Sequence, residues 1–170
     1  MRYKRQEVVI GKEAQKQLEK SKVSIVGIGA LGTVVADILG RAGVHLNLID
    51  RDIIEETNLQ RQVLFQEEDK GKPKALVAKK RLKKINSSIK INANFIHLDS
   101  ENISHLRADA IVDCTDNIET RQLLNEYAIK ENIPLINVSA IRYHGFVYVV
   151  TKKPSERCIL KDAKIGETCE

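Results

Sequence analysis

The 170 residues are 42% hydrophobic and 30% charged, which is typical of a folded globular protein and excludes a disordered chain. The net charge of +5 favours an anionic ligand, but only 4% of residues are aromatic and no nucleic-acid-binding motif accompanies the basic run at 79–84, so DNA and RNA are excluded as main partners. Residues 1–11 lack the apolar core of a signal peptide, and no apolar run approaches the roughly 18 residues of a membrane span.

The first twenty residues are predicted to form a basic arm and one helix. Residues 2–6 carry three basic side chains and have no apolar partner nearby in the sequence. From Gly11 to Lys20 the pattern is helical, with Ala14, Gln15 and Leu18 on the inner side. We therefore expect residues 1–20 to be an N-terminal arm and helix attached to the main domain.

A β-α-β unit follows. Residues 23–26 read as a buried strand that runs into Gly27-Ile28-Gly29-Ala30-Leu31-Gly32, then a helix over 33–42 that ends at Gly43, then a strand over 46–50. In this motif Gly27 permits the tight turn, Gly29 lets the backbone approach a ligand, and Gly32 lets the helix sit close to the strand. Asp50 ends the second strand, where a carboxylate can accept hydrogen bonds from ribose hydroxyls. The unit predicts a nucleotide site without specifying the nucleotide.

A densely polar loop continues from that strand over residues 50–62. It carries Asp52, Asn58, Arg61 and Gln62. A loop of this composition could simply be solvated, but in open α/β sheets ligands bind just beyond the carboxyl ends of the strands, which is where this loop begins.

The remaining pattern alternates strands and helices. A helix over 74–85 is opened by Pro73, a strand covers 89–96, and a buried strand at 110–112 leads into the polar residues 113–117. A helix over 119–131, a strand over 134–138 and an antiparallel strand over 146–150, after a turn at Gly145, complete the pattern, and residues 152–170 form a weakly structured tail. The fold class is therefore α/β: a Rossmann-like doubly wound, mostly parallel sheet with helices on both faces and an antiparallel edge strand.

This topology brings two polar loops together. The doubly wound order places the first and fourth strands on either side of the switch point, so residues 50–61 and 113–117 face one crevice. There Asn58, Arg61 and Lys74 suit a polyphosphate, and Asp116, with Asp52 possible, suits Mg²⁺. A nicotinamide dehydrogenase does not need these groups, whereas a nucleoside triphosphate does, so phosphoryl or nucleotidyl transfer is favoured.

Five motifs occur in the order found in a known family. They are Arg2-Tyr3-x-Arg5-Gln6, the glycine motif at 27–32, Asp50-x-Asp52-(x)4-Thr57-Asn58-Leu59-Gln60-Arg61-Gln62, Gly71-x-Pro73-Lys74-Ala75, and Asp113-Cys114-Thr115-Asp116-Asn117-(x)3-Arg121. Over residues 2 to about 151 the sequence resembles the ubiquitin-activating superfamily, and most closely its small prokaryotic members that adenylate sulfur-carrier proteins.

The resemblance implies an adenylyltransferase. It would use MgATP to adenylate the C-terminal glycine of a ubiquitin-like carrier protein ending in Gly-Gly, releasing pyrophosphate. Asp50 would bind ribose, Asn58, Arg61 and Lys74 the phosphates, and Asp116 the Mg²⁺. Arg5 would reach the γ-phosphate from the other subunit of a homodimer. The predicted catalytic residues are Arg5, Arg61, Lys74 and Asp116, and the predicted nucleotide-contacting residues are Gly27, Gly29, Ala30, Asp50, Asp52, Asn58, Arg61, Gln62, Lys74, Asp116 and Asn117.

The chain also departs from the family pattern. Ala30 stands where the family usually has glycine, next to the nucleotide. Cys158 is the only cysteine near the position of the first zinc-binding pair, so no zinc is predicted. Cys169 is expected to be non-catalytic and Cys114 to serve packing, and three unpaired cysteines indicate a reducing cytoplasm. The expected organisation is a single ATP-binding adenylation domain over 1–170, and the alternatives are a non-catalytic nucleotide-binding member or an NAD-dependent oxidoreductase.

Overall fold

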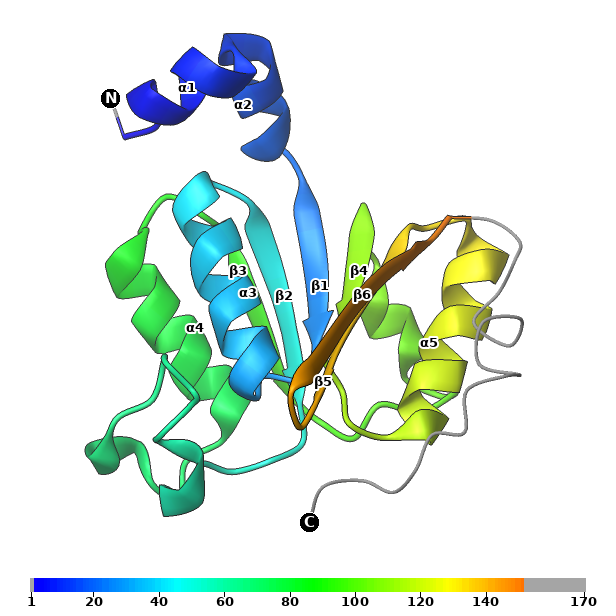
Figure 1. Ribbon diagram of the computed structural model, residues 1–170. Helices are drawn as coiled ribbons and strands as arrows, with labels where there is room; N and C mark the ends of the chain where they lie inside the picture. Colours follow the sequence, from blue (N-terminus) through cyan, green and yellow to red (C-terminus); the bar gives the residue numbers. More distant parts are fainter. Residues whose placement is uncertain (1, 152–170) are drawn as a thin grey trace.

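A computed structural model describes residues 2–151 as one six-stranded sheet with helices on both faces (Figure 1). The strands lie in the order β3-β2-β1-β4-β5-β6, parallel except for β6, which pairs antiparallel with β5. Their bounds are β1 Lys22–Val26, β2 His45–Asp50, β3 Ile91–Phe95, β4 Ala110–Asp113, β5 Leu135–Ile141 and β6 His144–Val150. The predicted doubly wound sheet with an antiparallel edge strand is confirmed.

Five α-helices and three short 3₁₀ helices connect the strands. The α-helices are α1 Lys4–Ile10, α2 Lys12–Leu18, α3 Ala30–Ala42, α4 Lys74–Ile85 and α5 Ile118–Glu131. The 3₁₀ helices are η1 Glu56–Asn58, η2 Glu67–Asp69 and η3 Ile103–Leu106. α4 has the bounds expected from its apolar spacing, and Gly43 ends α3 in the left-handed conformation, as predicted.

The core has two layers because successive strand residues point to opposite faces of the sheet. Ile25 and Leu48 pack with α3 and α4 on one face, whereas the neighbouring residues Val26 and Ile49 pack with α5 on the other. A parallel sheet covered in this way has strands buried on both sides, so the polar residues inside β1 and β2 need partners: Asn47 Nδ2 donates to the Ser24 hydroxyl at 2.9 Å.

The strand order fixes the position of the switch point. β1 lies between β2 and β4, and the chain leaves β1 and β4 in opposite directions across the sheet. The predicted juxtaposition of the first and fourth strands is therefore present, and the segments that follow β1, β2 and β4 emerge at the same edge of the sheet (Figure 1).

Two segments differ from their predicted form. The expected basic arm is helical: α1 and α2 are separate short helices, broken at Gly11 with φ +83°. Its residues also have partners far along the chain, because Asn86 Nδ2 donates to the Tyr3 hydroxyl at 2.9 Å and Arg2 Nη1 donates to the Ile85 carbonyl at 3.0 Å. The prediction failed because these partners lie about 80 residues away in the sequence.

The β5–β6 hairpin also turns earlier than predicted. Arg142 and Tyr143 form its two-residue turn, with Arg142 at φ +53°, and Gly145 lies within β6 opposite Ala140. Glycine is the usual residue for such a turn, but here an arginine adopts the left-handed conformation. Among residues 2–151, no helix has the length and apolarity that crossing a bilayer requires.

Candidate functional site

The glycine motif packs tightly on one side and is open on the other. Gly27 has φ +85°, and a Cβ placed on it would lie 2.8 Å from the Cys114 carbonyl oxygen. A Cβ on Gly32 would lie 1.9 Å from the Gly27 carbonyl oxygen, so α3 can approach the turn only because this residue is glycine. At Gly29 the nearest atom would be Gln62 Nε2, 3.9 Å away. Backbone next to Gly29 is thus accessible to a ligand.

Gly29 is also the N-cap of α3. It provides no side-chain acceptor, so the first backbone N–H groups of this 13-residue helix point towards the open side of the turn. Together with the helix dipole, such groups favour phosphate. Ala30 is the first helical residue, and α3 begins three residues earlier than the sequence pattern predicts.

Asp50 ties the glycine motif to the end of β2. Its Oδ2 accepts the Ile28 N–H at 2.6 Å and its Oδ1 accepts the Asp52 N–H at 2.7 Å. Burial raises the pKa of Asp50, while these two hydrogen bonds and the nearby Lys74 charge oppose the rise. Each oxygen keeps a further lone pair, so the carboxylate can still accept ribose hydroxyls.

Residues 51–73, here called the β2 loop, contain most of the remaining predicted site residues. Ile54, Leu64 and Phe65 are buried in the α3–α4 core layer and hold the loop to the domain. Asn58 is buried and its Oδ1 accepts the Glu55 N–H at 3.0 Å, which caps η1. Arg61 is exposed, and its Nη1 donates to the Thr57 carbonyl at 2.8 Å.

Lys74 is the first residue of α4 and follows the β2 loop directly. Only 6% of Lys74 is exposed, and its Nζ donates to Asp52 Oδ2 at 2.9 Å. The Asp52 side chain is 56% exposed, so this ion pair joins a buried cation to a carboxylate that contacts solvent. Burying an ammonium group costs free energy unless a negative charge lies next to it. The position of Lys74 is therefore suited to binding an anionic group.

Gln62 contributes an unused polar atom at the same place. The residue is 2% exposed, and its Oε1 has no hydrogen-bond partner within the described part of the chain. Its Nε2 is the atom that faces Gly29. A buried amide with unused capacity beside accessible backbone is suited to a polar ligand or an ordered water.

Residues 114–117, here called the β4 loop, lie on the other side of the glycine motif. Asp113, at the end of β4, is fully buried; its Oδ1 accepts the Thr115 N–H at 2.9 Å and the Thr115 hydroxyl at 2.6 Å. Arg121 of α5 lies across it, with Nε 3.3 Å from Asp113 Oδ2 and Nη2 donating to the Thr115 carbonyl at 2.6 Å. Burial raises the pKa of Asp113 although the Arg121 charge lowers it.

The other members of the β4 loop have distinct environments. Asp116 is exposed and Asn117 is half-buried, where its Oδ1 accepts the Thr120 N–H at 2.8 Å as the N-cap of α5. Burial raises the pKa of the Cys114 thiol to about 12, so the sulfur is unreactive, as its packing position predicts. Cys158 and Cys169 lie outside the described residues, as do the predicted tail and the segment considered for zinc.

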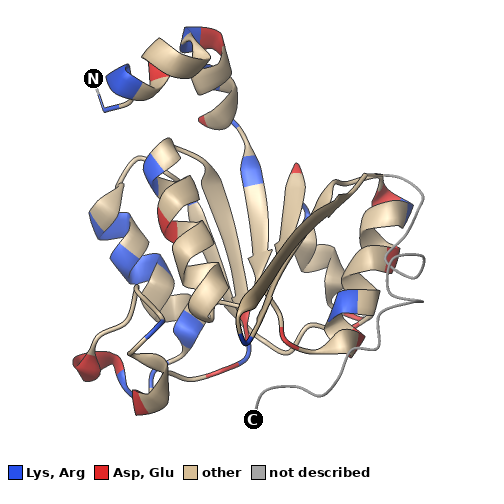
Figure 2. Cartoon of the chain, viewed as in Figure 1, with Lys and Arg blue, Asp and Glu red and all other residues tan. Residues whose placement is uncertain are grey.

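The predicted site residues of the glycine motif, the β2 loop and the β4 loop, together with Lys74, are gathered at one edge of the sheet. Arg5 is not among them. It is exposed on α1, which lies beyond the amino ends of the strands, at the end of the sheet opposite to the two loops (Figure 1). The charge map shows the same separation between the basic residues of α1 and the acidic residues that follow β2 (Figure 2).

Two half-buried, ion-paired arginines received no role from the sequence. In the sequence, Arg121 is the last residue of the 113–121 motif and Arg81 belongs to the basic run at 79–84. In the structure Arg121 holds the β4 loop and Arg81 lies against Asp69 of the β2 loop at 2.7 Å. Arg81 lies seven residues after Lys74 and therefore on the same face of α4. This spacing could have indicated that Arg81 faces the β2 loop and not solvent.

Residues 3–169 match the ThiF family. The chain belongs to the ThiF family. A curated relative, the sulfur carrier protein ThiS adenylyltransferase of Bacillus subtilis, is 41% identical over 99% of this chain and 53% of its own length. The molybdopterin-synthase adenylyltransferase of Haemophilus influenzae is 38% identical over 91% of this chain and 66% of its own length. The chain thus spans about half to two thirds of the length of these relatives.

ThiF-type structures share the arrangement. A crystal structure of E. coli MccB with ATP superposes with a TM-score of 0.83 at 31% identity, covering 92% of this chain and 51% of that one. The resemblance to the ubiquitin-activating superfamily is confirmed by these findings. Among residues 2–151, no three His, Cys, Asp or Glu side chains are grouped as a metal site.

Proposed function

We propose that this chain contains the ATP-binding site of an adenylyltransferase that activates the C-terminal glycine of a small ubiquitin-like sulfur-carrier protein. The observation that carries the proposal is Lys74, a buried ammonium held by a solvent-facing carboxylate beside Asp50 and the glycine motif. A nicotinamide site needs the aspartate and the glycines alone, whereas a triphosphate also needs buried positive charge. The relatives named as adenylyltransferases support this choice.

The donor set fits ATP in one orientation. Asp50 accepts the ribose hydroxyls, and the first backbone N–H groups of α3, which begins at Ala30, lie on the phosphate side. Asn58 Nδ2, Arg61 and Lys74 provide donors and charge for the phosphates, and the amide of Gln62, from the β2 loop, faces Gly29 of the glycine motif. Asp52 orients the Lys74 ammonium before the ligand binds. Because the Asp52 side chain is 56% exposed, water can solvate its carboxylate when Lys74 turns to the phosphates.

Asp116 would hold Mg²⁺ in this proposal. Its carboxylate is exposed and belongs to no ion pair within residues 2–151, and a single carboxylate with phosphate oxygens is a common Mg²⁺ environment. Asn117 caps α5 and so fixes the backbone next to Asp116. When bound, the ion would neutralise charge on the phosphates; the protein's part is to present the carboxylate from a loop fastened by Arg121.

The proposed reaction joins a carboxylate to the α-phosphorus. An oxygen of the carrier's C-terminal glycine attacks the α-phosphorus, the bond to the bridging oxygen of the β-phosphate breaks, and pyrophosphate leaves with that electron pair. Lys74 and Arg61 stabilise the negative charge that develops on the phosphates, and no proton transfer is needed because the nucleophile is already a carboxylate. Positioning therefore supplies most of the catalysis.

The position of Arg5 supports a homodimer in which it acts on the partner's ATP. Within one chain Arg5 and the β2 loop lie at opposite ends of the sheet (Figure 1). On the same helix Val8 and Val9 are 81% and 83% exposed, and α1 buries none of its residues. An apolar helix surface of this kind is suited to a second copy, which would carry Arg5 to the other site. A cytoplasmic location is part of the same proposal.

ATP–pyrophosphate exchange tests the proposed reaction. Exchange should require a carrier protein that ends in Gly-Gly, and Arg61→Ala and Asp116→Ala should abolish it, while Lys79→Ala on the exposed side of α4 serves as the control. If the chain neither binds ATP in a calorimeter nor catalyses exchange with any carrier, the proposal is wrong. ATP binding without exchange would identify a non-catalytic member, and NADH binding in place of ATP an oxidoreductase.

Complementation tests the homodimer. Arg5→Ala and Arg61→Ala subunits should each be inactive alone, and a mixture should recover about a quarter of the normal exchange rate, because random pairing forms one intact site in half of the dimers. If mixing restores nothing while both variants fold and dimerise, Arg5 does not act in trans.

A further inference from the structure

The β2 loop is long for a segment that must present several side chains accurately. It spans residues 51–73, and its regular structure is limited to the two short helices η1 and η2 and an isolated antiparallel bridge between Ile53 and Pro73. Ile54, Leu64 and Phe65 fasten its first two thirds through the core. The last part, residues 66–73, is rich in charge, so another kind of contact must hold it.

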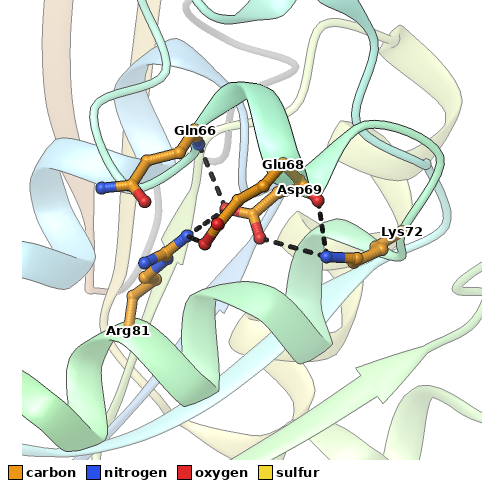
Figure 3. Close-up of polar contacts among 5 residues, drawn as sticks. All are labelled: Gln66, Glu68, Asp69, Lys72 and Arg81. Atoms are coloured by element: carbon orange, nitrogen blue, oxygen red, sulfur yellow. Dashed lines mark hydrogen bonds and ion pairs between the residues drawn. The ribbon is translucent and has the colours of Figure 1, made fainter.

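That contact is an ion-pair cluster between η2 and α4 (Figure 3). Arg81 Nη2 donates to Asp69 Oδ2 at 2.7 Å and to Glu68 Oε1 at 2.8 Å. Asp69 Oδ2 also accepts the Gln66 N–H at 3.1 Å, which completes the capping box of η2. Lys72 lies on the other side, with Nζ donating to the Glu68 carbonyl at 2.6 Å.

The central pair of this cluster joins a buried carboxylate to a half-buried guanidinium. Asp69 is 5% exposed and the Arg81 side chain 18%, whereas Glu68 and Lys72 are largely solvated. Exposed pairs contribute little, but removing one partner of a buried pair leaves an uncompensated charge in the protein. The Arg81–Asp69 contact therefore links α4 to the end of the β2 loop through a carboxylate that would be left buried and unpaired without Arg81.

A short backbone ladder connects this pair to the candidate site. From Asp69 the chain continues to Gly71, whose N–H donates to the Ile54 carbonyl at 2.8 Å, and the Ile54 N–H donates back to the Lys72 carbonyl at 2.9 Å. The next bond joins the Lys74 N–H to the Asp52 carbonyl at 3.0 Å. The backbones of Asp52 and Lys74 are thus set by the same ladder that the ion pair anchors.

We propose that Arg81 is a positioning residue for nucleotide binding, which acts by fastening Asp69 and so fixing the ladder that aligns Asp52 with Lys74. The inference rests on the proposed function, because it takes Lys74 to be a phosphate-binding group. Arg81 and Lys74 lie on the same face of α4, so the helix fixes both ends of the ladder. Neither Arg81 nor Asp69 touches the ligand in this arrangement.

The first test needs no ligand. Hydrogen–deuterium exchange of the backbone amides at 54, 69–72 and 74 should become at least about tenfold faster in Arg81→Ala, because the buried carboxylate of Asp69 has lost its charged partner. Arg81→Lys keeps the charge and should restore part of the protection. Arg41→Ala is the matched control, since Arg41 pairs with Asp37 at 3.0 Å on α3 and should leave these amides unchanged.

The second test measures the site. In the same variants the KM for ATP in pyrophosphate exchange should rise about tenfold in Arg81→Ala and less in Arg81→Lys, with kcat changed less than about threefold, because binding geometry is lost and the reacting groups remain. Asp69→Asn should reproduce the pattern, and it replaces Arg81→Ala if that variant does not fold.

The outcomes separate this inference from the function on which it rests. Unchanged amide exchange in Arg81→Ala shows that the pair does not fasten the loop, and faster exchange with an unchanged KM shows that the loop does not position the site; either overturns the proposal. If the unaltered chain binds no ATP, the proposed function fails and the positioning role fails with it. Wild-type ATP binding with the expected pattern in the variants supports both.

Discussion

The β2 loop spans residues 51–73 and the β4 loop only residues 114–117, yet each follows a buried aspartate at a strand end, Asp50 or Asp113. Gly27 lies against the β4 loop so closely that a Cβ would lie 2.8 Å from the Cys114 carbonyl. A Cβ on Gly29 would instead face the β2 loop, with Gln62 Nε2 at 3.9 Å. A ligand therefore has room between Gly29 and the β2 loop. Because the β4 loop backbone packs against Gly27, this loop can contact the ligand only through an exposed side chain.

The charges of the two segments follow this difference. The β2 loop leads to a buried cation, Lys74, whereas the β4 loop presents an exposed carboxylate, Asp116. A buried charge acts in a low dielectric and is not screened, while an exposed carboxylate suits an ion that arrives with its own water and phosphate ligands. In the proposed function, the segment of the β2 loop and Lys74 would supply fixed protein charge, and the β4 loop would recruit the Mg²⁺ ion through Asp116.

Lys74→Ala should give the largest effect. Removing a group that stabilises charge in the transition state usually lowers the rate by about 10²–10³-fold, and we expect pyrophosphate exchange to fall by the same factor. Added Mg²⁺ should not restore it, because the ion is proposed to act from the β4 loop. Lys79→Ala, on the exposed face of the same helix, should remain near the normal rate, and a loss below about tenfold in Lys74→Ala would contradict the comparison.

Paired glycine substitutions test the difference in packing with a smaller expected effect. Gly32→Ala places a methyl group 1.9 Å from the Gly27 carbonyl, so it should lower the free energy of unfolding by about 1–3 kcal/mol or more, as overpacking does. Gly29→Ala meets only Gln62 Nε2 at 3.9 Å, so the fold should keep its stability while ATP affinity falls. Chemical denaturation and calorimetry measure the two quantities; equal destabilisation would show that the motif is packed on both sides.

The sequence predicted the sheet order and the position of both loops, since these follow from local patterns and a general connection rule. The β-α-β unit, Gly43 as the end of α3 and the whole of α4 were all readable within windows of a few turns. Asp50 was placed correctly for the same reason, because a polar residue that ends a buried strand must lie at the sheet edge.

Features that depend on distant partners were not predicted. Tyr3 and Arg2 reach Asn86 and Ile85, and without those contacts residues 2–6 look like a free basic arm. Arg81 looked like one of several solvated basic residues, because Asp69 lies on another element. The β5–β6 turn was misplaced because glycine is the usual turn residue, whereas here Arg142 adopts φ +53° and the strand register moves Gly145 into β6.

The smallest predicted effect is a difference in how the free energy of unfolding depends on pH. It is measured at two carboxylates: Asp69 in the β2 loop and Asp113 directly before the β4 loop. Burial raises the pKa of Asp69, but hydrogen bonds from Arg81 and the Gln66 amide outweigh it, so the pKa lies below its ordinary value of 3.8. The stabilisation is therefore present above pH 3.8 and is lost as the pH falls through the lowered value. Burial leaves the pKa of Asp113 raised, so its stabilisation is present below pH 3.8 and is lost as the pH rises through the raised value.

Asn substitutions at these two positions should consequently have opposite pH slopes. At pH 7 Asp69→Asn should lower the free energy of unfolding by about 1–3 kcal/mol, as loss of a charged hydrogen bond does, and the deficit should shrink as the pH falls below 3.8. For Asp113→Asn the stability relative to the unaltered chain should instead rise as the pH increases from 3.8, because only the unaltered chain must ionise a buried carboxyl. Urea unfolding at several pH values gives both slopes. If the two variants showed pH slopes of the same sign, Arg121 would keep Asp113 ionised as Arg81 keeps Asp69. The proposed electrostatic difference between the two loops would then be wrong.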